Sequence, residues 1–199
     1  MIDFKSVIIK IFDRIHSIYW SKIYSQYRKK YAIDPSFRFN GENIIFYQNG
    51  EIICGKSSYI GKHSSIQSIS GHKVQIGCNC SISHYVHIYT CNNSADQDFA
   101  NINEKTMGDV LIGDYCWIGI KSSIIGPATI GENAVIGANS LVNRDLPPHS
   151  ISIGVPARVV KFKSYLSKDE KFKLASKYEC VLSAQLKKQM FNRTANAAI

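Results

Sequence analysis

The stretch LIGDYCWIGIKSSIIGPATIGENAVIGANSLV, residues 111–142, carries an aliphatic residue at every sixth position. These positions are Ile112, Ile118, Ile124, Ile130, Ile136 and Val142. Four of them are followed directly by glycine, and a small residue stands two positions before each of the later five. The same phase appears earlier at Cys54, Ile60, Ile76, Ile82 and Ile88. Two segments, 67–74 and 91–109, interrupt the pattern.

A period of six fits neither an amphipathic helix nor simple strand alternation, so each unit must contain a short strand and a corner. One aliphatic and one small side chain per unit can point inward, while the glycine permits a sharp turn and close packing of successive coils. The fold class predicted is therefore mainly β, a parallel solenoid in which each coil buries its inner side against its neighbours.

Four motifs resemble the hexapeptide-repeat acyltransferases, and in particular the sugar O-acetyltransferase branch related to galactoside and maltose acetyltransferase. They are IGDYCWIG (112–119), TIGENAVIGANSLV (129–142), RDLPPHS (144–150) and IGVPARVVK (153–161). The resemblance implies a left-handed parallel β-helix, which departs from the usual right-handed crossover. It also implies a homotrimer that uses acetyl-CoA to acetylate a sugar hydroxyl.

Three regions are expected. Residues 41–162 form the β-helix with a loop at 91–109, preceded by a helical region (1–40) and followed by a helical tail (163–199). The first helix carries Phe4, Ile8, Ile11, Ile15, Ile18 and Ile23 at helical spacing, with interspersed lysines. We favour a helix that caps the open end of the solenoid, while peripheral contact with an anionic membrane is the alternative. Ser167 and Glu170 predict a capping box for the tail.

Composition leaves the partner open. A net charge of +9 suits nucleic acid, a membrane surface or a phosphorylated small molecule. The resemblance favours a coenzyme and a saccharide over nucleic acid. The six cysteines lack paired CxxC spacing, and no secretory signal is recognised, so we expect a reduced, cytoplasmic protein.

The catalytic base has to be chosen among several histidines. Acyl transfer to a hydroxyl needs a base, and histidine suits this role near neutral pH. Counting back from Trp117 by the family spacing places the catalytic histidine where this chain has Asn93. We therefore favour His84 as the base with Asn93 as a hydrogen-bond donor, and keep His87 as the alternative base. Loss of catalysis, leaving a trimeric binding protein, is a third hypothesis.

The remaining site residues lie near the expected base or follow from the resemblance, which implies the coenzyme contacts. Tyr85, Asn92 and Asp96 are expected to contact the acceptor. The coenzyme is expected along two coils, with its phosphates near basic residues; the residues concerned are Trp117, Gly119, Ile120, Gly137, Ala138, Asn143, Arg144, Arg158 and Lys161. No metal is expected, because His84 and His87 lack a convincing third ligand.

The most plausible acceptor is a component of bacterial surface polysaccharide, O-antigen or capsule. Acetylation of an amino sugar or of an antibiotic is the alternative within the same fold. The sequence does not name the sugar, the hydroxyl, or whether the acceptor is free, nucleotide-linked, lipid-linked or polymeric.

Overall fold

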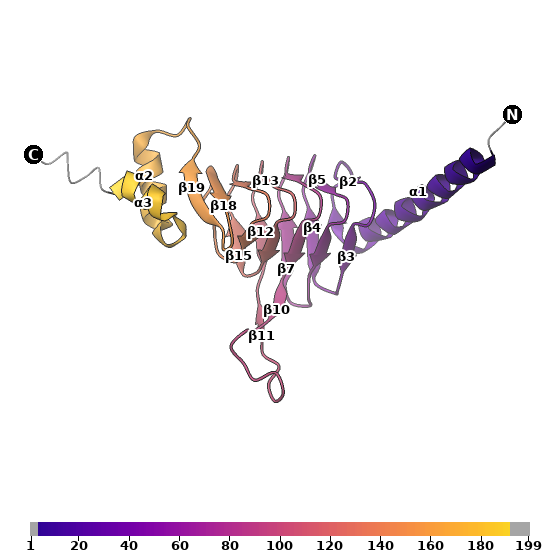
Figure 1. The fold of residues 1–199 in the computed structure, drawn as a ribbon, viewed down its shortest axis with the longest axis horizontal. Helices are drawn as coiled ribbons and strands as arrows, with labels where there is room; N and C mark the ends of the chain where they lie inside the picture. Colours follow the sequence, from indigo (N-terminus) through magenta and orange to yellow (C-terminus); the bar gives the residue numbers. More distant parts are fainter. Residues whose placement is uncertain (1–3, 192–199) are drawn as a thin grey trace, which may run out of the picture.

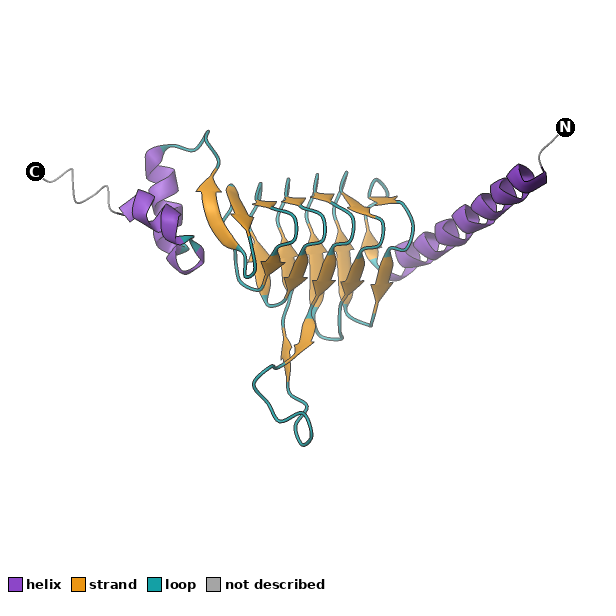
Figure 2. Cartoon of the chain, in the orientation of Figure 1, coloured by secondary structure: helices purple, strands orange, loops and turns teal. Residues whose placement is uncertain are grey.

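The centre of the molecule is a three-sided parallel β-solenoid, seen in a computed structural model that describes residues 4–191 (Figure 1). Helix α1 (Phe4–Lys30) extends from one end of the solenoid. At the other end lie helix α2 (Lys168–Lys177), the short 3₁₀ helix η1 (Glu179–Val181) and helix α3 (Ala184–Phe191). A hairpin projects from the side of the stack (Figure 2).

Three sheets form the faces of the solenoid. Face A consists of β1 (Ala32–Ile33), β4 (Glu51–Cys54), β7 (Lys73–Ile76), β12 (Val110–Ile112) and β15 (Ala128–Ile130). Face B consists of β2 (Arg38–Asn40), β5 (Tyr59–Gly61), β8 (Ser81–Ile82), β13 (Trp117–Ile118), β16 (Val135–Ile136), β18 (Ser150–Ile153) and β19 (Arg158–Phe162). Face C consists of β3 (Ile45–Tyr47), β6 (Ser65–Gln67), β9 (His87–Tyr89), β14 (Ser123–Ile125) and β17 (Leu141–Val142).

The six-residue period corresponds to one face of the solenoid. Ile82, Ile118 and Ile136 lie in register on face B, and each is fully buried. Between these aliphatic layers, small residues such as Cys116 and Ala134 fill the interior. The predicted parallel solenoid is therefore confirmed, and buried Cys54, Cys80 and Cys116 help to fill its core.

The glycines of the repeat have only one of their two predicted roles. Gly119 has no positive φ, but a Cβ there would lie 2.6 Å from the backbone nitrogen of Ala138 on the next coil. The turn itself uses the left-handed region at a later residue, as at Lys121 and Asn139, with φ of 58° and 56°. Glycine is thus required for the close approach of coils and not for the turn.

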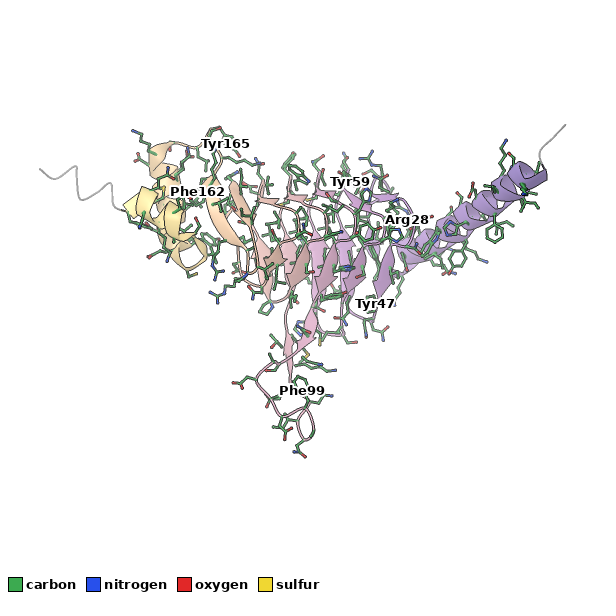
Figure 3. All side chains as sticks on the ribbon, viewed as in Figure 1. Arg28, Tyr47, Tyr59, Phe99, Phe162 and Tyr165 are labelled. Atoms are coloured by element: carbon green, nitrogen blue, oxygen red, sulfur yellow. The ribbon has the colours of Figure 1, made fainter. Side chains whose placement is uncertain are left out.

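The C-terminal half of α1 covers the first coil. The ring of Tyr24 stacks on Phe39 at 4.3 Å between centroids, and Tyr27 stacks on Phe46 at 5.2 Å. Partial burial in this aromatic cluster raises the pKa of Tyr24 to about 12. Arg28, at the same junction in Figure 3, donates to the carbonyl oxygens of Asp34 and Phe37. The C-terminal half of α1 therefore caps the open end of the solenoid.

The boundaries differ slightly from those expected. Strands β1 and β2 already pair with the second coil, so the solenoid starts at Ala32 and not at residue 41. At the other end β19 runs to Phe162 and turns back antiparallel against β18. The predicted capping box is present, because Ser167 and Glu170 bond reciprocally at the start of α2. The end of the predicted tail, residues 192–199, lies outside the described residues.

The longer interruption is a hairpin. Strands β10 (Cys91–Asn93) and β11 (Lys105–Met107) pair antiparallel, with Asn93 opposite Lys105. The hairpin leaves the stack after β9, at the corner where face C passes to face A (Figure 1). The shorter interruption, residues 68–72, is a wider turn at the same corner one coil earlier.

Candidate active site

Four coils align at the corner between faces B and C, which we call the B–C corner. Its members are Lys62–His63, His84–Tyr85, Ile120–Lys121 and Ala138–Asn139. Backbone hydrogen bonds join successive coils: Tyr85 N donates to Lys62 O at 3.0 Å, Lys121 N to His84 O at 3.1 Å, and Asn139 N to Ile120 O at 2.9 Å. Parallel coils at this spacing are about 4.8 Å apart. His84 therefore lies one coil from Ile120 and two from Ala138.

The His84 ring sits over a glycine. A Cβ at Gly61 would lie 2.5 Å from His84 Nδ1, so only glycine leaves room for the ring. Nδ1 is buried and has no hydrogen-bond partner among the described residues. Exchange of a proton with a bound substrate must therefore use Nε2. Next to it, Tyr85 stacks on His63 at 4.9 Å between ring centroids and is partly exposed.

His87, the alternative base, has different surroundings. It lies on the outer side of face C, where its Nδ1 is 2.8 Å from Ser65 Oγ. Tyr89 stacks beside it, and Ser65 Oγ also contacts the Tyr89 hydroxyl at 3.3 Å. Tyr47 lies at the edge of this group (Figure 3). Burial raises its pKa, and the neighbouring Tyr89 raises it further. His87 is thus held by a hydroxyl network that His84 lacks.

A third arrangement, which the sequence did not predict, pairs an imidazole with a carboxylate. His72 Nδ1 is 3.1 Å from Asp109 Oδ1, which also accepts from Lys73 N at 3.1 Å. This pair lies at the root of the hairpin, since Asp109 ends the interrupted segment. The only sequence signal was that both residues flank breaks in the repeat.

His16 and His149 have structural contacts. His16 pairs with Glu42 and accepts from Trp20 Nε1, and His149 contacts Tyr165 Oη at 2.9 Å. Within residues 4–191, no three His, Cys, Asp or Glu side chains gather around a point that could hold a metal ion.

The predicted acceptor residues on the hairpin are exposed. Asn92 and Asn93 lie on β10, and Asp96 is in the loop beyond it. The carboxylate of Asp98, further along the loop, accepts hydrogen bonds from Asn101 Nδ2 and Ala100 N, and these bonds lower its pKa. Because β9 separates the B–C corner from the hairpin, the fold of one chain does not bring His84 and Asn93 together.

The predicted coenzyme residues divide into three places. Trp117 is 55% exposed on face B, and Ile120 and Ala138 lie at the B–C corner. Asn143 and Arg144 are exposed at the opposite edge of face C, after β17. Arg158 and Lys161 lie on β19, paired with Ile153 and Ile151. One chain therefore presents Asn143 and Arg144 on a different edge from Ile120 and Ala138, whereas Arg158 lies opposite Ile153 on the B–C corner side of face B.

The six-residue repeat, with one short strand per face and successive coils in register, is typical of hexapeptide solenoids. A family model described as bacterial transferase hexapeptide (six repeats) matches residues 109–144. Galactoside O-acetyltransferase of Escherichia coli (strain K12) is 30% identical over 155 residues, which cover 72% of this chain and 75% of that protein.

Two solved structures are similar over most of the chain. A maltose O-acetyltransferase from Clostridium difficile 630 has a TM-score of 0.56 and 28% identity, covering 72% of this chain and 75% of its own. A hexapeptide-repeat acetyltransferase from Vibrio cholerae O1 biovar eltor, complexed with acetyl coenzyme A, has a TM-score of 0.56 and 25% identity, covering 71% and 76%. The chain belongs to the hexapeptide-repeat acetyltransferases, in the sugar O-acetyltransferase family. It is an enzyme, and its solenoid is the left-handed β-helix that the repeat implies.

Proposed function

We propose that this enzyme transfers the acetyl group of acetyl-CoA to a sugar hydroxyl, in the synthesis of a bacterial surface polysaccharide such as O-antigen or capsule. Its relatives include a galactoside and a maltose O-acetyltransferase, and one structural neighbour binds acetyl-CoA. The observation that carries the proposal is the B–C corner, where a histidine lies one coil from the residues expected to hold the thioester.

The reaction is a direct transfer. His84 Nε2 takes the proton of the acceptor hydroxyl as its oxygen attacks the thioester carbonyl carbon. The carbon–sulfur bond then breaks, and the thiolate of coenzyme A receives the proton from the imidazolium. The amide nitrogens of Asn93 and Asn92 stabilise the oxyanion or hold the sugar, with Tyr85 and Asp96 beside the acceptor. His87 is the alternative base.

The proposed assembly is a homotrimer in the cytoplasm. Since His84 and Asn93 lie on separate edges of one chain, a seam between two solenoids is required to bring them into one cleft. The same seam joins the two coenzyme edges. Trp117, Gly119, Ile120, Gly137 and Ala138 line the pantetheine, while Asn143, Arg144, Arg158 and Lys161 face the phosphates.

One alternative remains. Transfer to the amine of an amino sugar or antibiotic would use the same cleft and produce an amide. The third hypothesis from the sequence, a non-catalytic trimeric binding protein, does not agree with membership of this enzyme family, although Asn93 stands where the family's histidine is expected.

The decisive experiment incubates the purified protein with acetyl-CoA and a panel of free, nucleotide-linked and lipid-linked saccharides that includes amino sugars. Release of coenzyme A thiol reports transfer, and cleavage of the product by hydroxylamine separates an ester from an amide. We expect an ester. An amide would overturn O-acetylation, and no thiol release above the hydrolysis background with any acceptor would overturn transfer to a saccharide.

The base is assigned with matched variants. His84→Gln should lower the turnover by about 10²–10⁴-fold, the usual contribution of a general base. His149→Gln, a structural histidine away from the B–C corner, should leave turnover near wild type. If His87→Gln abolishes turnover and His84→Gln does not, the base is His87.

Contact of α1 with a membrane is the remaining expectation. Within residues 4–191, none of the helices combines the length and hydropathy that crossing a bilayer requires. Exposed isoleucines and nearby lysines in the first half of α1 support a peripheral contact, which would suit a lipid-linked acceptor. Their spacing supports a different occupant more strongly.

A further inference from the structure

The N-terminal half of α1 has an apolar side that none of residues 4–191 covers. Ile8, Ile11, Ile15 and Ile18 are 46%, 53%, 60% and 60% exposed, and the helix runs clear of the solenoid here (Figure 1). Isolated exposed aliphatics are common in proteins, but four isoleucines in one stripe indicate an interaction surface.

The spacing of these isoleucines is that of a coiled coil. Successive intervals of three, four and three residues put Ile8 and Ile15 at a positions and Ile11 and Ile18 at d positions of a heptad. Isoleucine at both a and d shifts the preference from two strands to three or four. The next a and d positions are Lys22 and Ser25, so the seam ends at Ile18.

The seam also faces away from the chain's own solenoid. Residues nine apart differ by two and a half turns of an α-helix and lie on opposite sides. Ile15 is nine residues before Tyr24, and Ile18 is nine before Tyr27; these two tyrosines are the ones that stack on the first coil. One side of the helix therefore contacts its own solenoid, and the opposite side, which carries the isoleucines, is exposed.

We propose that the N-terminal halves of α1 from three copies of the chain pack as a parallel three-stranded coiled coil. This inference rests on the proposed homotrimer, whose threefold symmetry makes the helices parallel. The flanking positions suit it: Val7 at g faces Phe12 at e of the neighbour, and Arg14 at g faces the ring of Tyr19. Lys10, Asp13 and Ser17 take the outer positions c and f.

An anionic membrane is the rival occupant, and three features make it less suitable. The isoleucines keep the alternating interval of a seam, and the outer side carries Lys10, which would lie away from the lipid. Trp20, the residue best suited to a membrane interface, stacks with Tyr24 on the side that meets the solenoid.

The test is cross-linking between single cysteines. In the full chain with Cys78, Cys91 and Cys180 changed to serine, Ile11→Cys places a thiol in the seam and Asp13→Cys places one on the outside of the same helix. A short bismaleimide should join Ile11→Cys chains into covalent dimers at low protein concentration, and should leave Asp13→Cys chains as monomers on a denaturing gel. Equal yields for the two variants would overturn the coiled coil.

Two measurements separate this proposal from the one it rests on. Light scattering gives the mass of the unmodified protein: a trimer whose Ile11→Cys chains do not cross-link contradicts only the coiled coil, whereas a monomer contradicts the proposed assembly as well. Sedimentation with phosphatidylglycerol vesicles should leave the protein in solution, as with phosphatidylcholine. Binding to the anionic vesicles that the I11D/I15D variant loses would assign the stripe to a membrane.

Discussion

At the scale of single residues, the site depends on the absence of a side chain. His84 occupies the space above Gly61, and Gly119 lets the next coil approach Ala138. Both glycines have ordinary backbone angles, so their requirement is steric and not conformational. Glycines of the repeat thus leave room for the His84 ring at the same kind of position where successive coils pack closely.

Replacing Gly61 by alanine tests this directly. The new Cβ would lie 2.5 Å from His84 Nδ1 and 2.7 Å from its backbone nitrogen, so both ring and backbone must shift. We expect a stability loss of about 1–3 kcal/mol from overpacking. Because small misplacements of a catalytic group are costly, turnover should fall by roughly 10²-fold. Urea unfolding and thiol release measure the two effects.

The double variant provides the control. If Gly61→Ala acts through the His84 ring, adding His84→Gln should lower turnover little further. Independent, multiplying losses would mean that Gly61 supports catalysis by another route.

At the scale of elements, a local sequence signal was sufficient to predict where α2 begins. Ser167 Oγ accepts from Glu170 N at 3.2 Å, and Glu170 Oε2 accepts from Ser167 N at 2.8 Å. The hydrogen bond from Ser167 lowers the pKa of Glu170. These contacts lie within four residues of one another, which is why the sequence alone was enough to predict them.

The capping box gives α2 a defined pH dependence. A carboxylate with a lowered folded pKa stabilises the helix at pH above the unfolded value of about 4.5. That contribution disappears as the pH falls through the folded pKa. We expect the protection of the first-turn amides of α2 against hydrogen exchange, taken relative to that of β14, to fall in acid. Glu170→Gln, which cannot ionise, should remove the pH dependence of this difference.

Longer-range features were less predictable. The solenoid followed from the period because inward positions such as Ile118 and Ile124 are fully buried at every coil. In α1 the apolar pattern indicated an amphipathic helix, but not that its two halves use opposite sides. The pairing of His72 with Asp109 spans 37 positions and the whole hairpin, so no local spacing could show it.

At the scale of the whole molecule, the catalytic groups proposed here come from different copies. His84 lies at the B–C corner and Asn93 beyond the far edge of face C. If neighbouring solenoids supply one group each, two inactive variants can complement each other.

Mixed trimers test the shared cleft. His84→Gln and Asn93→Ala chains should each show little turnover alone. After co-expression, random assembly should return about a quarter of the wild-type turnover per cleft, because one cleft in four receives both native residues. Thiol release measures the recovery. No recovery from a confirmed mixed trimer would mean that His84 and Asn93 do not share a cleft between two chains.

The antiparallel pairing of β19 with β18 affects whether such solenoids can stack end to end. Identical rungs can in principle be added without limit, and an unprotected terminal rung offers its unpaired amides and carbonyls to any similar surface. Here the last rung of face B meets a strand of opposite direction, while the aromatic rings of α1 occlude the first. Both terminations disfavour end-to-end growth of such solenoids into filaments.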